Sequence, residues 1–89
     1  MTPDDLRAAI ARDCPHRLAD YDAHLAGRTP TTGFIQLWRE EHAISSRPAI
    51  EQQIAGLYER IQDTGTREQA MPLFEEISRI RHEIREGLK

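Results

Sequence analysis

Residues 50–61 have the sequence IEQQIAGLYERI, in which large aliphatic side chains recur at helical spacing. The four side chains are Ile50, Ile54, Leu57 and Ile61, separated by four, three and four residues. This spacing places them on one face of a helix, and it is typical of helices that pack along one another at a shallow angle. The stretch therefore predicts a helix whose apolar face lies against a second helix.

The second helix is expected downstream, where the same pattern returns. Its apolar side chains are Leu73, Ile77, Ile80, Ile84 and Leu88, separated by four, three, four and four residues. Between the two patterns lies Asp-Thr-Gly-Thr at residues 63–66, a composition typical of loops. Because a short connection makes neighbouring helices antiparallel, we predict a helical hairpin of residues 47–63 and 70–88.

A third helix is predicted immediately before the hairpin, over residues 34–46. Its apolar residues are Phe34, Leu37, Trp38 and Ile44. Ser45 or Ser46 can cap the next helix, whose first turn contains Pro48.

Residues 1–26 are expected to form two short helices. Thr2 and Pro3 are suited to the start of the first helix, and Pro15 ends it near Asp13 or Cys14 and opens the second. The GRTPTTG stretch at residues 27–33 indicates a loop. We predict an all-α protein, a small helical bundle in which residues 1–89 form one domain.

The composition limits the classes of function. The chain has 89 residues, a formal net charge of −3 and one cysteine, so no internal disulfide is possible and a nucleic-acid-binding role is disfavoured. The acidic N-terminus does not resemble a signal peptide, and no apolar run is long enough for a membrane span. We expect a cytoplasmic protein that does not bind membranes.

No motif predicts an enzyme, a metal site or a cofactor. The histidines, His16, His24, His42 and His82, include no pair three or four residues apart, as two metal ligands on one helix would require. Cys14 is close to His16 but has no predicted orienting base, and neither glycine of the loop belongs to a phosphate-binding motif. We therefore expect a non-enzymatic protein without a cofactor.

The aromatic residues leave two interpretations open. Trp38 can fill the junction between the hairpin and the N-terminal helices, or it can be an exposed anchor for a protein partner. The same two interpretations, core residue or partner anchor, apply to Phe34 and Tyr58.

An alternative interpretation is a helix-turn-helix DNA-binding regulator formed by residues 37–54. Its candidate contacts to bases and phosphates are Ser45, Ser46, Arg47, Gln52 and Gln53. Glutamates in the same helices oppose this interpretation because they would bring negative charge towards the phosphates.

Three segments carry a resemblance to a known family: PDDLRAAI at 3–10, LADYDAHL at 18–25 and FIQLWREEHAISSRP at 34–48. In this first half the chain resembles a small actinobacterial family of unknown function, whose members are often encoded beside RelE-like toxins. The resemblance implies an antitoxin-like role, in which the protein covers the active surface of a small basic ribonuclease toxin.

The expected partner-binding residues combine aromatic anchors with acids of the last helix that would meet arginines of the toxin. They are Trp38, Phe34, Tyr58, Glu75, Glu76, Glu83 and Glu86. A further alternative is that the hairpin self-associates into a homodimer and acts as a structural adaptor.

Overall fold

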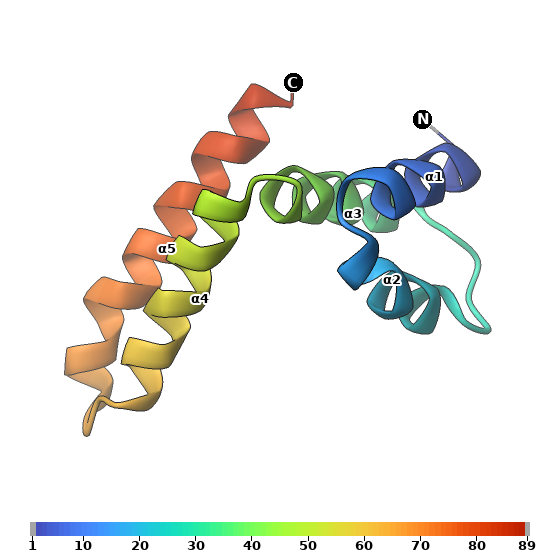
Figure 1. Cartoon of the computed structure of the whole chain (residues 1–89). Coiled ribbons are helices and arrows are strands. Elements are labelled where there is room, and N and C mark those ends of the chain that lie inside the picture. The colour runs from blue at the N-terminus through green and yellow to red at the C-terminus, as the bar shows by residue number, and fades with distance from the viewer. Residues whose placement is uncertain (1, 89) are drawn as a thin grey trace. The chain divides into compact units, whose positions relative to one another are not determined.

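The computed structural model describes residues 2–88, and over this range it contains α-helices, one 3₁₀ turn and no strand (Figure 1). The elements are α1 (Pro3–Asp13), the 3₁₀ turn η1 (Pro15–Arg17), α2 (Leu18–Leu25), α3 (Thr32–Ser45), α4 (Pro48–Gln62) and α5 (Arg67–Gly87). The predicted all-α class and the small helical bundle are confirmed. None of the described helices combines the length and the apolar character that a membrane crossing requires.

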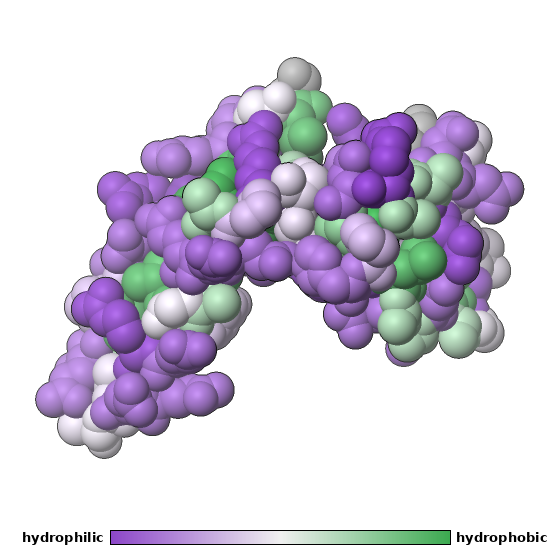
Figure 2. All heavy atoms as spheres, in the orientation of Figure 1, coloured by the Kyte–Doolittle hydropathy of each residue, from purple (hydrophilic) through white to green (hydrophobic). Residues whose placement is uncertain are grey.

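The chain divides into two compact units, Met1–Ser46 and Arg47–Lys89, which we call unit 1 and unit 2. Unit 1 contains α1 to α3, and unit 2 contains α4 and α5. In the view of Figure 2, hydrophilic residues cover most of both units and hydrophobic ones occupy smaller areas. The expectation of one domain over residues 1–89 stays a prediction, because a division by contacts does not test whether the units unfold together.

The first helix begins and ends where the sequence indicates. The Thr2 hydroxyl accepts a hydrogen bond from the Asp5 N–H at 3.1 Å, and the Asp5 carboxylate accepts one from the Thr2 N–H at 3.3 Å. This reciprocal capping satisfies two N–H groups that the helix itself leaves without partners. Pro15 then starts a 3₁₀ turn, and α2 follows only at Leu18, so the predicted second helix is preceded by a short tighter turn.

Helix α3 begins at Thr32, two residues before the predicted start at 34, because Thr31 caps it. The Thr31 hydroxyl accepts a hydrogen bond from the Phe34 N–H at 3.1 Å. The loop before it therefore covers residues 26–31 instead of the predicted 27–33. Within the loop, Gly27 has a φ of +70°, a conformation that costs glycine little and other residues more.

Helix α4 begins at Pro48, one residue after the predicted start at 47, and its cap differs from the prediction. The residue before it is Arg47, which makes no capping bond with its side chain. Ser45 is the last residue of α3, and the Ser46 hydroxyl donates back to the Ala43 carbonyl at 3.4 Å. The predicted cap by Ser45 or Ser46 is wrong, because Ser45 lies within α3 and the Ser46 hydroxyl bonds to the Ala43 carbonyl.

Helix α5 begins at Arg67, three residues before the predicted start at 70. The Thr66 hydroxyl accepts from the Gln69 N–H at 3.2 Å, and the Gln69 side chain accepts from the Gly65 N–H at 3.0 Å. Pro72 lies inside this helix and cannot donate the backbone hydrogen bond of its position.

Each unit has its own apolar packing. In unit 1 the buried cluster consists of Leu6, Ile10, Cys14, Tyr21 and Trp38, with Leu18, Leu25, Phe34 and Ile35 packed against it. In unit 2, α4 and α5 run antiparallel along each other, as predicted (Figure 1). The buried residues of this hairpin are Ile54, Leu57, Ala70, Leu73, Ile77, Ile80 and Ile84. Ile50 and Ile61 of α4 are half-buried.

Candidate protein-binding site

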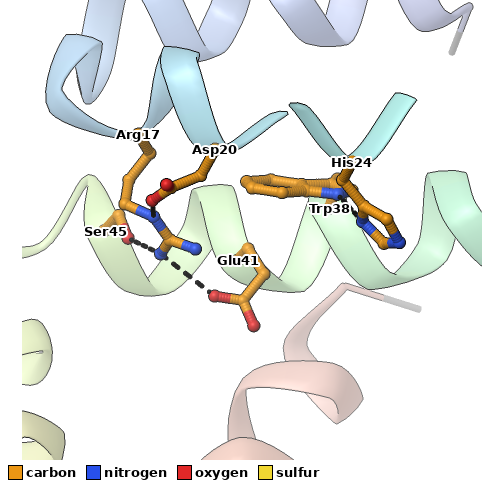
Figure 3. Close-up of polar contacts among 6 residues, drawn as sticks. All are labelled: Arg17, Asp20, His24, Trp38, Glu41 and Ser45. Carbon is orange, nitrogen blue, oxygen red and sulfur yellow. Dashed lines mark hydrogen bonds and ion pairs between the residues drawn. The ribbon is translucent and has the colours of Figure 1, made fainter. Parts of the chain in front are cut away.

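Trp38 belongs to the core of unit 1. Its side chain is 4% exposed, and the indole Nε1 donates a hydrogen bond to His24 Nδ1 at 2.9 Å (Figure 3). The edge of the ring meets Tyr21 at a centroid distance of 5.3 Å, and the Arg17 guanidinium lies 5.2 Å from the indole centroid. Because the apolar body is buried and the N–H has its partner, the interpretation of Trp38 as an exposed partner anchor is wrong.

Arg17 joins three elements of unit 1 by hydrogen bonds (Figure 3). Its guanidinium donates to Asp20 at 3.1 Å, to Glu41 at 3.1 Å and to the Ser45 hydroxyl at 2.8 Å. Ser45 is only 3% exposed, so its hydroxyl is held inside unit 1 and has no surface for a base contact.

The other residues of the DNA-binding alternative lie at or after the end of α3. Ser46 is half-buried, whereas Arg47, Gln52 and Gln53 are exposed. The connection between α3 and α4 consists of residues 46–47, and a DNA-reading motif of this type usually has a turn of about three or four residues. Together with the burial of Ser45, the short connection disfavours the helix-turn-helix alternative.

Phe34 also packs within unit 1. Its ring centroid lies 5.5 Å from that of Tyr21 and 5.1 Å from that of His24. The side chain is half-buried, so it combines a packing role with a partly accessible edge.

The exposed aromatic side chains lie on the hairpin instead. Tyr58 is 43% exposed, and Met71 and Phe74 are 43% and 46% exposed. Tyr58 was predicted as a candidate, whereas Met71 and Phe74 were missed. Their signal in the sequence was that both are large apolar residues that fall outside the repeating seam of α5.

The heptad register places these three side chains on one side of the hairpin, here called the aromatic side. Tyr58 directly follows the buried Leu57, and Phe74 directly follows the buried Leu73, so both occupy the position that flanks the seam. In an antiparallel pair these flanking positions of the two helices lie on the same side of the seam. Met71 is three residues before Phe74 and shares its face of α5.

The same register places the predicted glutamates of α5 on different sides of the seam. Glu75 is exposed and lies four residues after Met71, next to the aromatic side. Glu76 and Glu83 each precede a buried isoleucine, which places them on the opposite side of the seam, and Glu86 follows Glu83 by one helical turn. Of the four predicted glutamates, the register therefore places only Glu75 on the face of α5 that carries Met71.

Two of these glutamates have local partners. Glu76 lies 3.5 Å from Arg79, and Glu86 lies 3.9 Å from His82, in pairs spaced three and four residues apart. Exposed pairs of this kind contribute only about 0.2–0.5 kcal/mol to helix stability.

The resolved pKa shifts of carboxylates lie in unit 1. The pKa of Asp13 is held far below its ordinary value, first by the hydrogen bonds from Arg12 and then by the contact with His42 at 2.9 Å. The pKa of Asp22 is lowered by its paired hydrogen bonds from Arg7, both 2.9 Å long. The His42 contact joins α3 to Asp13 of α1, and the Arg7 pair joins α1 to α2, so these shifts mark structural ion pairs of the first unit.

Residues 2–88 contain no group of three or more His, Cys, Asp or Glu side chains placed to hold a metal ion. Comparison with known proteins gives no match to any family model, curated protein or solved structure.

Proposed function

We propose that this protein is a non-enzymatic protein-binding module whose contact surface is the aromatic side of the hairpin. The supporting observation is the exposure of Tyr58, Met71 and Phe74 on one side of a two-helix unit. Tyrosine, phenylalanine and methionine are enriched at protein interfaces relative to other surfaces. Isolated exposed apolar residues are common on monomers, but three large ones within a few helical turns favour a contact surface.

The proposed partner is a small basic protein, and a RelE-like toxin is the first candidate. The chain has a formal net charge of −3, and the exposed Glu59 and Glu75 follow Tyr58 and Phe74 in the sequence. A net negative charge favours encounter with a basic partner and penalises acidic ones. The resemblance of the first half of the chain to a family encoded beside RelE-like toxins points to the same class.

In this proposal the hairpin inhibits by covering the active surface of the partner. The aromatic side chains are buried at the centre of the interface, where truncating a side chain lowers the binding free energy most. Glu75 then lies at the edge of the contact and meets basic side chains that otherwise bind RNA. The acids on the opposite side of the seam, Glu76 and Glu83, remain in solvent.

The test is to co-express the full chain with a RelE-like toxin and to measure growth, complex formation and affinity. We expect a complex on size-exclusion chromatography and rescue of growth. The double variant Tyr58→Ser/Phe74→Ser is expected to weaken binding at least about tenfold, because two anchors are lost. Leu37→Ser is the matched control, since Leu37 is 41% exposed but lies in unit 1, and it should leave the affinity within about twofold.

Three results would contradict parts of the proposal. If no complex forms with the wild-type chain, the toxin is not the partner. If the complex forms but the double variant binds equally well, the aromatic side is not the contact surface. If the chain alone elutes as a dimer that the double variant dissociates, the surface binds a second copy, as in the structural-adaptor alternative.

A further inference from the structure

A groove of about 330 Å³ opens on unit 1 between the end of α2 and the first turns of α3. Its lining combines four polar or charged side chains, His24, Arg28, Thr29 and Thr31, with Gly33, Phe34 and Leu37. The volume is at the lower end of the roughly 300–1,000 Å³ of small-molecule sites. The proposed contact surface on the hairpin does not use this groove.

The orientation of His24 is set by Trp38. Its Nδ1 accepts the indole hydrogen bond at 2.9 Å, so Nδ1 carries no proton and the hydrogen of the neutral ring is on Nε2. In Figure 3 the second ring nitrogen of His24 lies on the side away from Trp38. His24 thus lines the groove with a ring whose orientation is fixed by the buried Trp38.

Arg28 provides a cation at the same groove. The positive φ of Gly27, +70°, turns the chain after α2, and the Arg28 N–H then bonds to the Leu25 carbonyl at 3.0 Å. Within residues 2–88, the Arg28 side chain has no carboxylate partner, in contrast to Arg7 and Arg12, which bind Asp22 and Asp13. Its guanidinium thus keeps its full set of donors for a ligand.

The apolar part of the groove is formed by Phe34 and Leu37. Phe34 lies against His24 at a centroid distance of 5.1 Å, which holds its ring in place, and Leu37 is 41% exposed. An aromatic ring placed here would gain contact with Phe34 in the offset or edge arrangement that such pairs prefer.

We propose that this groove binds a small aromatic carboxylate. The carboxylate would accept charge-assisted hydrogen bonds from Arg28, whose planar fork matches its geometry, and a further bond from His24 Nε2. The ring would lie on Phe34 and Leu37. The site selects for both parts of the ligand, because an anion without a ring forgoes the apolar contact and a neutral ring forgoes the ionic bonds.

The test is an NMR titration of the full ¹⁵N-labelled chain at pH 7 with phenylacetate, phenylacetamide and acetate. Phenylacetate should shift the amide signals of residues 24–37 and saturate with a dissociation constant of about 1 mM, as expected for a small ligand in an open site. Phenylacetamide and acetate should each bind at least about tenfold more weakly, since one ionic or apolar contribution is missing.

Arg28→Gln supplies the decisive variant, and it should weaken phenylacetate binding at least about tenfold. Arg12→Gln is the control, because Arg12 is an exposed arginine of unit 1 outside the groove, and it should change the affinity less than about twofold. His24 is left in place because it holds Trp38. Equal affinity for acid and amide, unchanged binding by Arg28→Gln, shifts elsewhere in the chain, or no saturation would each overturn the proposal.

Discussion

Replacing Tyr21 with phenylalanine removes a single hydroxyl from the centre of unit 1 and keeps the aromatic contacts. The side chain is fully buried, and its hydroxyl donates to the Pro3 carbonyl at 3.0 Å. In the wild-type chain the ring centroid of Tyr21 lies 5.5 Å from that of Phe34 and 5.3 Å from that of Trp38. We expect the phenylalanine ring of the variant to keep both contacts. The substitution therefore isolates the bond that joins α2 to the start of α1.

The expected loss of unfolding free energy follows from the partners of that bond. A typical buried hydrogen bond contributes about 0.5–1.5 kcal/mol, and an acceptor left without any partner costs up to about 3 kcal/mol. Pro3 is the first residue of α1, so its carbonyl also accepts the helical bond from the N–H four residues later. Because the carbonyl keeps that partner, we expect a loss of about 1 kcal/mol.

Urea unfolding followed by tryptophan fluorescence measures this loss, since the only tryptophan of the chain, Trp38, contacts Tyr21. A loss of 1 kcal/mol should also lower the Tm by about 4–8 °C. Tyr58→Phe is the matched control, because Tyr58 is 43% exposed and its variant should stay within about 0.5 kcal/mol of wild type. Equal midpoints for Tyr21→Phe and the wild type, or an equal loss in Tyr58→Phe, would refute the reasoning.

Three further predictions concern stability. Gly56→Ala should raise the unfolding free energy by about 0.5–1 kcal/mol, because Gly56 is inside α4 and an added Cβ meets nothing within 4 Å. Gly27→Ala should lower the unfolding free energy, because the φ of Gly27 is positive. Thermal unfolding followed by circular dichroism compares the two variants, and a change of the same sign in both would contradict the prediction. Ile77→Ala should lower the unfolding free energy by about 2–5 kcal/mol, because Ile77 is only 4% exposed in the hairpin seam and its truncation leaves a cavity. Phe74→Ala should lower it far less in the same urea series, because Phe74 is 46% exposed. Similar losses in the two variants would contradict the assignment of the seam. Asp13→Asn should be less stable than wild type near neutral pH, because hydrogen bonds from Arg12 and then His42 lower the pKa of the Asp13 carboxyl. The stability that the ionised carboxylate contributes is present above its ordinary pKa of 3.8 and is lost as the pH falls through the lowered pKa. The difference in unfolding free energy between the two proteins should therefore narrow in acid, and a difference that stays constant with pH would argue against the ion pair.

The helices and the hairpin were predictable because their signals are local. The spacing of Ile54, Leu57 and Ile61 indicates the apolar face of α4 from the local sequence alone. The helix starts were harder, because a threonine next to a proline or glycine is compatible with both loop and cap. Thr31 and Thr66 each cap a helix, two or three residues ahead of the starts that the apolar pattern suggested.

The candidate site was predictable only in part, because exposure depends on neighbours that are distant in sequence. Trp38 is buried since Tyr21 and His24, on another helix, cover it and bind its N–H. Tyr58 has no such cover, although its aromatic side chain looked equivalent in the sequence. Met71 and Phe74 could have been found by asking which large apolar residues fall outside the seam.

Cys14, which is 1% exposed where α1 meets η1, is a natural probe of how often unit 1 opens. A thiol reagent reacts with the accessible thiolate, so Cys14 can be labelled only while unit 1 is open around it. The chain has no other cysteine, so the label reports on this one site. The kinetics of that single modification report how often unit 1 opens around Cys14 in the unaltered protein.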